Sequence, residues 1–151
     1  MRYLILALAL ALHLLTSGQA LASDKNEVIA PIQQFFDGFN SGDFKSAVAA
    51  CAEDASVIDD FPPHGWQGNG CQKWADAFQV LAKKDGITAA KITSGKPRHV
   101  DVNGDRAYVV IPVTLEVDRG KKHKKLPSIF TAALRKEAGV WRISAWAWAD
   151  L

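Results

Sequence analysis

The chain has 151 residues, 48% of them hydrophobic, and a formal net charge of +2 at pH 7 with neutral histidines. This length suits one domain with its own core, and so small a charge gives no indication of a nucleic-acid-binding protein. The two cysteines, Cys51 and Cys71, match no spacing typical of a metal site. We therefore expect a single domain without a metal ion, a cofactor or a nucleic-acid partner.

Residues 1–22 have the pattern of a secretory signal peptide. Arg2 supplies the positive start, Leu4–Leu15 is an apolar run, and Ala20-Leu21-Ala22 is a small-x-small cleavage signal. The apolar run is shorter than the ~20 residues that a membrane-spanning helix needs, so no stable membrane anchor is expected. We expect an exported protein, periplasmic or secreted, in which cleavage near Ala22 leaves residues 23–151.

Three helices are predicted in the first part of this domain. Apolar residues spaced by three and four predict a helix that begins close to Pro31 and ends before Gly42. Asp43 is expected to cap a second, short helix over 44–51. A third amphipathic pattern predicts a helix over 70–85.

Strands dominate the remainder of the chain. Extended segments are predicted over 87–102, 107–117, 125–135 and 141–149, and Pro112 indicates an edge or a bulge. Helices followed by an antiparallel meander indicate an α+β fold, in which three N-terminal helices cover one face of a curved sheet. The space between the helices and the sheet is the natural place for a pocket.

The stretch 55–68 carries the candidate chemistry. Asp59 ends a short strand and shares a face with Ala55 and Val57, so a pocket on that face would surround it with apolar groups. It is then a candidate general base or acceptor for a polar ligand group; the alternative is an aspartate that bonds the amides of the following turn. His64 is a candidate acid beside it, or an exposed loop histidine.

The last strand has two different faces. Ile143, Ala145 and Ala147 alternate with Trp146 and Trp148. The family resemblance described below implies that the alanines face the pocket; the tryptophans would then lie on the outer face, where we expect them at the centre of a homodimer interface. A β-bulge would exchange the two faces and place the tryptophans inside.

Four short motifs give the chain a family resemblance. Phe39-Asn-Ser-Gly-Asp43, Ala52–Val57, Trp66-Gln-Gly68 and Trp141-Arg-Ile143 fall in the order seen in SnoaL-like domains. These belong to the nuclear-transport-factor-2-like superfamily, which includes ketosteroid isomerases and scytalone dehydratase. The resemblance spans residues 23–151 and implies a cone of curved antiparallel sheet closed by helices, often dimeric.

The resemblance to ketosteroid isomerase is incomplete at the residues that matter for catalysis. The position of the general base of ketosteroid isomerase, which is an aspartate, matches Asp59. The positions of its two oxyanion donors fall on Phe35 and near Ile129 or Phe130, which cannot donate a hydrogen bond. Steroid isomerisation by that mechanism is therefore not expected.

These observations lead to one principal hypothesis and two alternatives. We expect an exported domain that binds a small, largely apolar molecule in a pocket formed by Phe35, Phe39, Asp59, Trp66, Tyr108, Phe130, Ala145 and Ala147. The alternatives are a proton-transfer enzyme of isomerase or dehydratase type with Asp59 as base, and an interaction module with a vestigial pocket. Cys51 and Cys71 are expected to form a disulfide, since exported chains meet an oxidising environment.

Overall fold

The computed structural model describes residues 25–151, so the predicted signal peptide lies outside the described residues. No helix among the described residues is long and apolar enough to cross a membrane. The elements are an N-terminal helix (residues 25–41), α2 (Phe44–Ala49), β1 (Cys51–Ile58), β2 (Gly65–Trp66), α3 (Gly70–Lys84), β3 (Ile87–Ser94), β4 (His99–Asn103), β5 (Arg106–Arg119), β6 (Lys122–Glu137) and β7 (Val140–Asp150).

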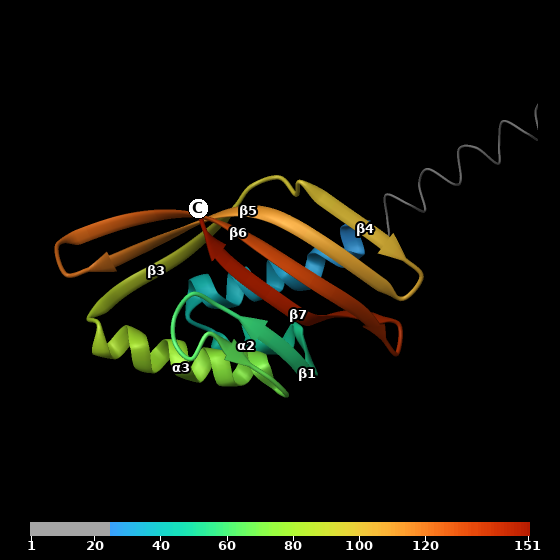
Figure 1. The fold of residues 1–151 in the computed structure, drawn as a ribbon, viewed down its shortest axis with the longest axis horizontal. Helices are drawn as coiled ribbons and strands as arrows, with labels where there is room; N and C mark the ends of the chain where they lie inside the picture. Colours follow the sequence, from blue (N-terminus) through green and yellow to red (C-terminus); the bar gives the residue numbers. More distant parts are fainter. Residues whose placement is uncertain (1–24) are drawn as a thin grey trace, which may run out of the picture.

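The strands form a single curved sheet with the helices on one side of it (Figure 1). The strand order is β2-β1-β7-β6-β5-β3, and β4 pairs with β5 beside β3. All neighbours are antiparallel except β1 and β7, which run parallel. The predicted α+β architecture is confirmed, with this one parallel pair as an addition to the expected meander.

The N-terminal helix is longer than its sequence pattern predicted. It includes Pro31, which was expected to lie near its start. Val28 and Ile32, on either side of the proline, are almost fully buried in the core. Burial of these side chains stabilises the first turns enough to offset the hydrogen bond that proline cannot donate.

Helix α2 packs closely against the N-terminal helix. Asp43 caps it as predicted, its Oδ1 accepting a hydrogen bond of 3.0 Å from the backbone N–H of Ser46. A Cβ atom at Gly38 would lie 2.5 Å from the backbone nitrogen of Ala47. Only a glycine at position 38 permits this close approach of the two helices.

The expected facing of β7 is wrong, because β7 contains a bulge. Ala133 of β6 pairs with Ala145, but Leu134 pairs with Ile143, so Ser144 is an extra residue in β7. The side-chain period of a strand is two residues, and one extra residue therefore exchanges the faces. Trp146 is 3% exposed on the inner side.

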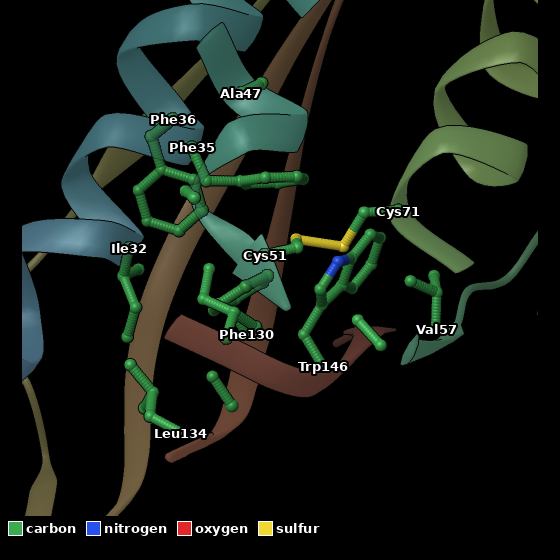
Figure 2. Packing of buried hydrophobic residues seen from close by; sticks show 14 of the residues in the cluster. Ile32, Phe35, Phe36, Ala47, Cys51, Val57, Cys71, Phe130, Leu134 and Trp146 are labelled. Atoms are coloured by element: carbon green, nitrogen blue, oxygen red, sulfur yellow. A yellow bond between two sulfur atoms is a disulfide. The ribbon is translucent and has the colours of Figure 1, made fainter. Parts of the chain in front are cut away.

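The core lies between the helices and the inner face of the sheet. Figure 2 shows Phe130 and Trp146 among its side chains, and the disulfide that joins Cys51 of β1 to Cys71 of α3. Trp146 packs against Phe35 and Phe130, each with ring centroids 5.5 Å apart. The predicted Cys51–Cys71 pairing is confirmed, and it fixes the start of α3 against β1.

We predict that the disulfide contributes about 3 kcal/mol to stability, because it closes a loop over a sequence separation of 20 residues in the unfolded chain. A Cys51→Ala/Cys71→Ala variant should unfold at lower urea concentration with a free energy of unfolding reduced by about that amount. Reducing agent should lower the stability of the wild type and leave the double variant unchanged. Two thiols that alkylate freely in the native, unreduced protein would contradict this prediction.

Candidate functional site

A cavity of about 230 Å³ opens between the helices and one end of the sheet. At liquid density this is room for about eight water molecules, which corresponds to a small ligand. The residues that line it are mainly apolar and aromatic, with several charged groups: Phe35, Phe39, Asp59, Asp60, Phe61, Trp74, Phe78, Leu81, Asp85, Ile87, Ile92, Leu115, Val117, Arg119, Leu126, Trp148 and Asp150.

Aromatic rings from the N-terminal helix and from α3 make up much of the wall of the cavity. Phe35 lies with its ring centroid 5.6 Å from that of Trp74. Phe39 lies 5.1 Å from Phe78, and Phe78 stacks on Trp74 at 5.6 Å. These residues follow the three-and-four spacing of their helices, which places them on the faces that meet.

Asp59 is the one buried carboxyl group among the residues that line the cavity, with 8% exposure. It follows the last residue of β1. Its Oδ2 accepts a hydrogen bond of 2.6 Å from the Trp74 indole Nε1–H, and its Oδ1 accepts one of 2.7 Å from the backbone N–H of Asp60. The carboxyl group is thus fixed in orientation by a wall residue of the cavity and by its own turn.

The pKa of Asp59 is raised from its ordinary value of 3.8 to about 7. Burial is the main cause, because it penalises the charged form of the carboxyl group. The neighbouring Asp60 side chain also raises the pKa, whereas the Trp74 hydrogen bond lowers it. Near neutral pH, Asp59 therefore exists in both protonation states and can donate or accept a proton.

Asn40 attaches one wall of the cavity to the N-terminal helix. Its side-chain amide donates to the carbonyl of Ile92 at 2.8 Å, and its carbonyl accepts from the N–H of Ile92 at 2.6 Å. Ile92 lies in β3, whose other edge pairs with β5. The edge of β3 that does not pair with β5 is thus bonded at Ile92 to the Asn40 side chain, which holds β3 against the N-terminal helix.

The exposed rim of the cavity is charged. Arg119 at the end of β5 pairs with Asp85 after α3, with an N–O distance of 3.4 Å. Asp150 at the end of β7 accepts hydrogen bonds from Ser128 Oγ at 2.7 Å and from Trp148 Nε1 at 3.0 Å. Asp60 is exposed beside Asp59.

The structure brings three of the predicted site residues together: Phe35, Phe39 and Asp59 all line the cavity. Phe130 is fully buried behind Phe35, with ring centroids 6.1 Å apart. Trp66 is buried against Phe61 at 5.0 Å. Phe130 and Trp66 thus pack behind or beside the cavity and are not among its lining residues.

Three other predicted pocket residues lie elsewhere. Ala145 and Ala147 lie on the outer face of the sheet because of the bulge at Ser144, opposite Ser56 and Ile58 of β1. Tyr108 is 46% exposed on the same outer face, with its ring 6.0 Å from that of His99. The assignment of these three residues to the pocket is therefore wrong.

His64, the predicted acid, is exposed and has a positive φ of 69°. Its Nδ1 lies 3.3 Å from the backbone carbonyl oxygen of Asp59, and the ring is not among the residues that line the cavity. It occupies the turn that follows Asp59, where the backbone N–H of Asp59 donates to the carbonyl of His64 at 3.2 Å. This geometry gives His64 a place in the turn and no contact with the carboxyl group.

Sequence reasoning missed the role of Trp74 as the side-chain partner of Asp59 and the roles of Phe78 and Trp148 as walls. Trp74 and Phe78 share the apolar stripe of α3, so their burial was foreseeable, but a stripe does not reveal which residue on another element it meets. Among residues 25–151, no group of three or more histidine, cysteine, aspartate or glutamate side chains is placed so that it could hold a metal ion.

Comparison with known proteins identifies the family of this chain. The family model for the SnoaL-like domain matches residues 28–147, and the chain belongs to this family. A search of curated protein sequences finds no match.

Solved structures with the same fold include proteins of several descriptions. A nuclear-transport-factor-2-like protein with a cystatin-like fold from Novosphingobium aromaticivorans is 18% identical, with a TM-score of 0.73, and the match covers 91% of this chain and 88% of that one. A ketosteroid isomerase-like protein from Erwinia carotovora atroseptica is 14% identical, with a TM-score of 0.69 and coverage of 85% and 96%. A nuclear-transport-factor-2-like protein of unknown function from Pseudomonas putida is 14% identical, with a TM-score of 0.71 and coverage of 85% and 87%. At these identities the likeness extends to the fold, which hosts many functions.

We predict that the free energy of unfolding depends on pH through Asp59. Between about pH 4 and about pH 7 the folded protein keeps the Asp59 proton, whereas the unfolded chain loses it. The free energy of unfolding should therefore decrease as the pH rises through this range, by up to about 4 kcal/mol in total, and should level off above it. The difference in unfolding free energy between wild type and Asp59→Asn, measured by urea denaturation across this range, should show this fall. An Asp101→Asn variant, which removes an exposed carboxylate on β4, should keep the wild-type profile.

Two neighbours of Asp59 should move its pKa in opposite directions. Trp74→Phe removes the indole donor and should raise the pKa further, whereas Asp60→Asn removes the neighbouring carboxyl group and should lower it. NMR titration of the Asp59 carboxyl carbon measures both shifts. A wild-type pKa below 3.8 would show that Asp59 serves only to cap its turn.

Proposed function

We propose that this protein binds a small, largely apolar molecule in the cavity, with Asp59 receiving the one polar group of the ligand. The observation that carries this proposal is the composition of the cavity wall, in which aromatic and aliphatic side chains surround one buried carboxyl group. Ligand pockets in proteins typically combine such walls with a few convergent polar groups. The open cavity argues against an interaction module with a vestigial pocket.

A proton-transfer activity is the second candidate, and the pKa of Asp59 favours it. A general base is most effective when its pKa lies near the working pH, as burial arranges here. Among residues 25–151, the cavity lining includes no hydroxyl group and no histidine that could act as a second catalytic group beside Asp59. Binding without turnover is therefore the better supported function.

Export of the mature domain is part of this proposal. The Cys51–Cys71 disulfide is compatible with an oxidising compartment, in which structural disulfides form and persist. Residues 1–22 supply the expected signal for that route.

We predict that filling the cavity abolishes ligand binding. Leu115 lines the cavity, and Leu115→Trp should place the larger ring in the cavity. The matched control is Thr114→Trp, since Thr114 is adjacent on β5 and its side chain points to the opposite face. Native mass spectrometry of the purified proteins should show a co-purified small molecule on the wild type and on the control, and none on Leu115→Trp. A ligand retained by Leu115→Trp would place the binding site elsewhere.

We also propose a homodimer through the outer face of the sheet. The tryptophans expected to anchor it lie inside, and the outer face instead presents small or uncharged side chains such as Ile58, Thr131 and Ala147. Ile58 is 60% exposed, which is high for a large apolar residue on a strand.

A charge in the centre of this face should prevent dimerisation. Ala147→Arg is expected to give a folded monomer in light scattering, because an unpaired arginine would be desolvated in the interface. Val80→Arg on α3, at a position 69% exposed and away from the sheet, is the control and should remain dimeric. A monomeric wild type, or an unchanged mass for Ala147→Arg, would contradict the dimer.

A further inference from the structure

The charges around the cavity are strongly unbalanced. Four carboxyl groups line it, those of Asp59, Asp60, Asp85 and Asp150. Arg119 is the one cation among the described residues that line it, and it is already paired with Asp85. Within the part of the chain that the structure describes, a ligand with a negative group would therefore meet carboxylates and no unpaired cation in this cavity.

The apolar part of the wall is unusually rich in aromatic rings. Phe35, Phe39, Trp74 and Phe78 surround the inner part, and Trp148 lies nearer the rim. The faces of such rings carry partial negative charge and attract cations within about 6 Å. A buried carboxyl group and several aromatic rings that line the same cavity are a combination that can recognise an ammonium group with an apolar body.

Resting on the ligand-binding function proposed above, we propose that the ligand is a small lipophilic amine whose ammonium group pairs with Asp59 and whose apolar body lies among the aromatic rings. The remaining acceptor capacity of Asp59 permits this pairing. An ionised carboxylate offers about four lone-pair sites, and the described contacts with Trp74 and the Asp60 N–H use one on each oxygen.

The energetics favour a cation over a neutral ligand at this position. Burial of Asp59 has already removed most of its hydration in the folded protein, so the binding partner need not desolvate it again. An ammonium group next to Asp59 stabilises the ionised form of its carboxyl group and so lowers its pKa from about 7. Binding of an amine near neutral pH should therefore release a proton.

The other charged groups near Asp59 change the size of the preference for a cationic ligand without reversing it. Asp60 lies next to it in the turn, and Asp85, Arg119 and Asp150 come from α3, β5 and β7 at the rim. With Arg119 and Asp85 paired, the rim leaves Asp60 and Asp150 as excess negative charge, which also favours a cationic ligand. The His64 ring contacts the backbone carbonyl of Asp59 from outside the cavity.

Three probes that share a phenylethyl body and differ in the charge of the terminal group test the charge preference: 2-phenylethylamine, 2-phenylethanol and 3-phenylpropanoate. Titrations of the wild type at about pH 8, followed by NMR and by calorimetry, should give the order amine, then alcohol, then carboxylate, with the amine at least about tenfold tighter than the alcohol. From about pH 8 to about pH 6 the affinity for the amine should fall about tenfold, because Asp59 takes up a proton, while that for the alcohol should change little. Near pH 7, calorimetry in buffers of different ionisation enthalpy should show release of about half a proton per amine bound.

Asp59→Asn should abolish the preference for the amine and retain binding of the alcohol, which also shows that the variant is folded. Asp101→Asn, on the outside of β4, should behave as the wild type. Equal affinities for amine and alcohol, or a preference that survives Asp59→Asn, would overturn the amine proposal and leave the ligand-binding function intact. Failure of all three probes to bind the wild type would overturn both.

Discussion

One extra residue in β7 determines which side chains face the interior. The bulge at Ser144 lets Ile143 and Trp146 both point inward, although they are three positions apart in the sequence and a regular strand would place them on opposite faces. Trp146 then packs against Phe35 and, at a centroid distance of 4.9 Å, against Trp74. The same shift places Trp148 in the cavity wall and leaves the alanines of β7 on the outer face. The tryptophans in the interior and the alanines on the outer face therefore have a single cause. Side chains alternate strictly between the two faces of a strand, so one extra residue exchanges the faces of every residue that follows it.

The packing of these rings also sets the chemistry of Asp59. Water is excluded from the carboxyl group by the side chains that build the core, and exclusion of water raises its pKa. Trp74 has two roles at this site: its ring forms part of the cavity wall, and its indole N–H donates a hydrogen bond to the carboxyl group. Stability and the proposed ligand recognition thus depend on the same residue, because a buried carboxyl group is costly to ionise in the absence of a suitable partner.

Two long-range ties hold the walls of the cavity in place. The disulfide joins β1 to the beginning of α3, and the Asn40 side chain joins the end of the N-terminal helix to β3. The α3 helix begins at Gly70, where a Cβ atom would lie 2.5 Å from the carbonyl oxygen of Ala55, so the helix can sit directly on β1. A cavity whose walls are fixed in this way needs little reorganisation to receive a ligand, which reduces the entropic cost of binding.

The sequence by itself determined the order of helices and strands, the α+β class, the family, the disulfide and the place of Asp59 in the wall of a pocket. These follow from local patterns, namely apolar periodicity, turn residues, a cap at Asp43 and motifs in a recognisable order. It did not determine the start of the N-terminal helix, because burial of Val28 and Ile32 outweighs the local effect of Pro31. Nor did it determine the facing of Ala145 and Ala147, since a bulge depends on how two strands pair and leaves no mark in the strand's own alternation. Only the tertiary structure joined Trp74 to Asp59 across 15 residues of chain, because such a contact depends on the packing of α3 against β1.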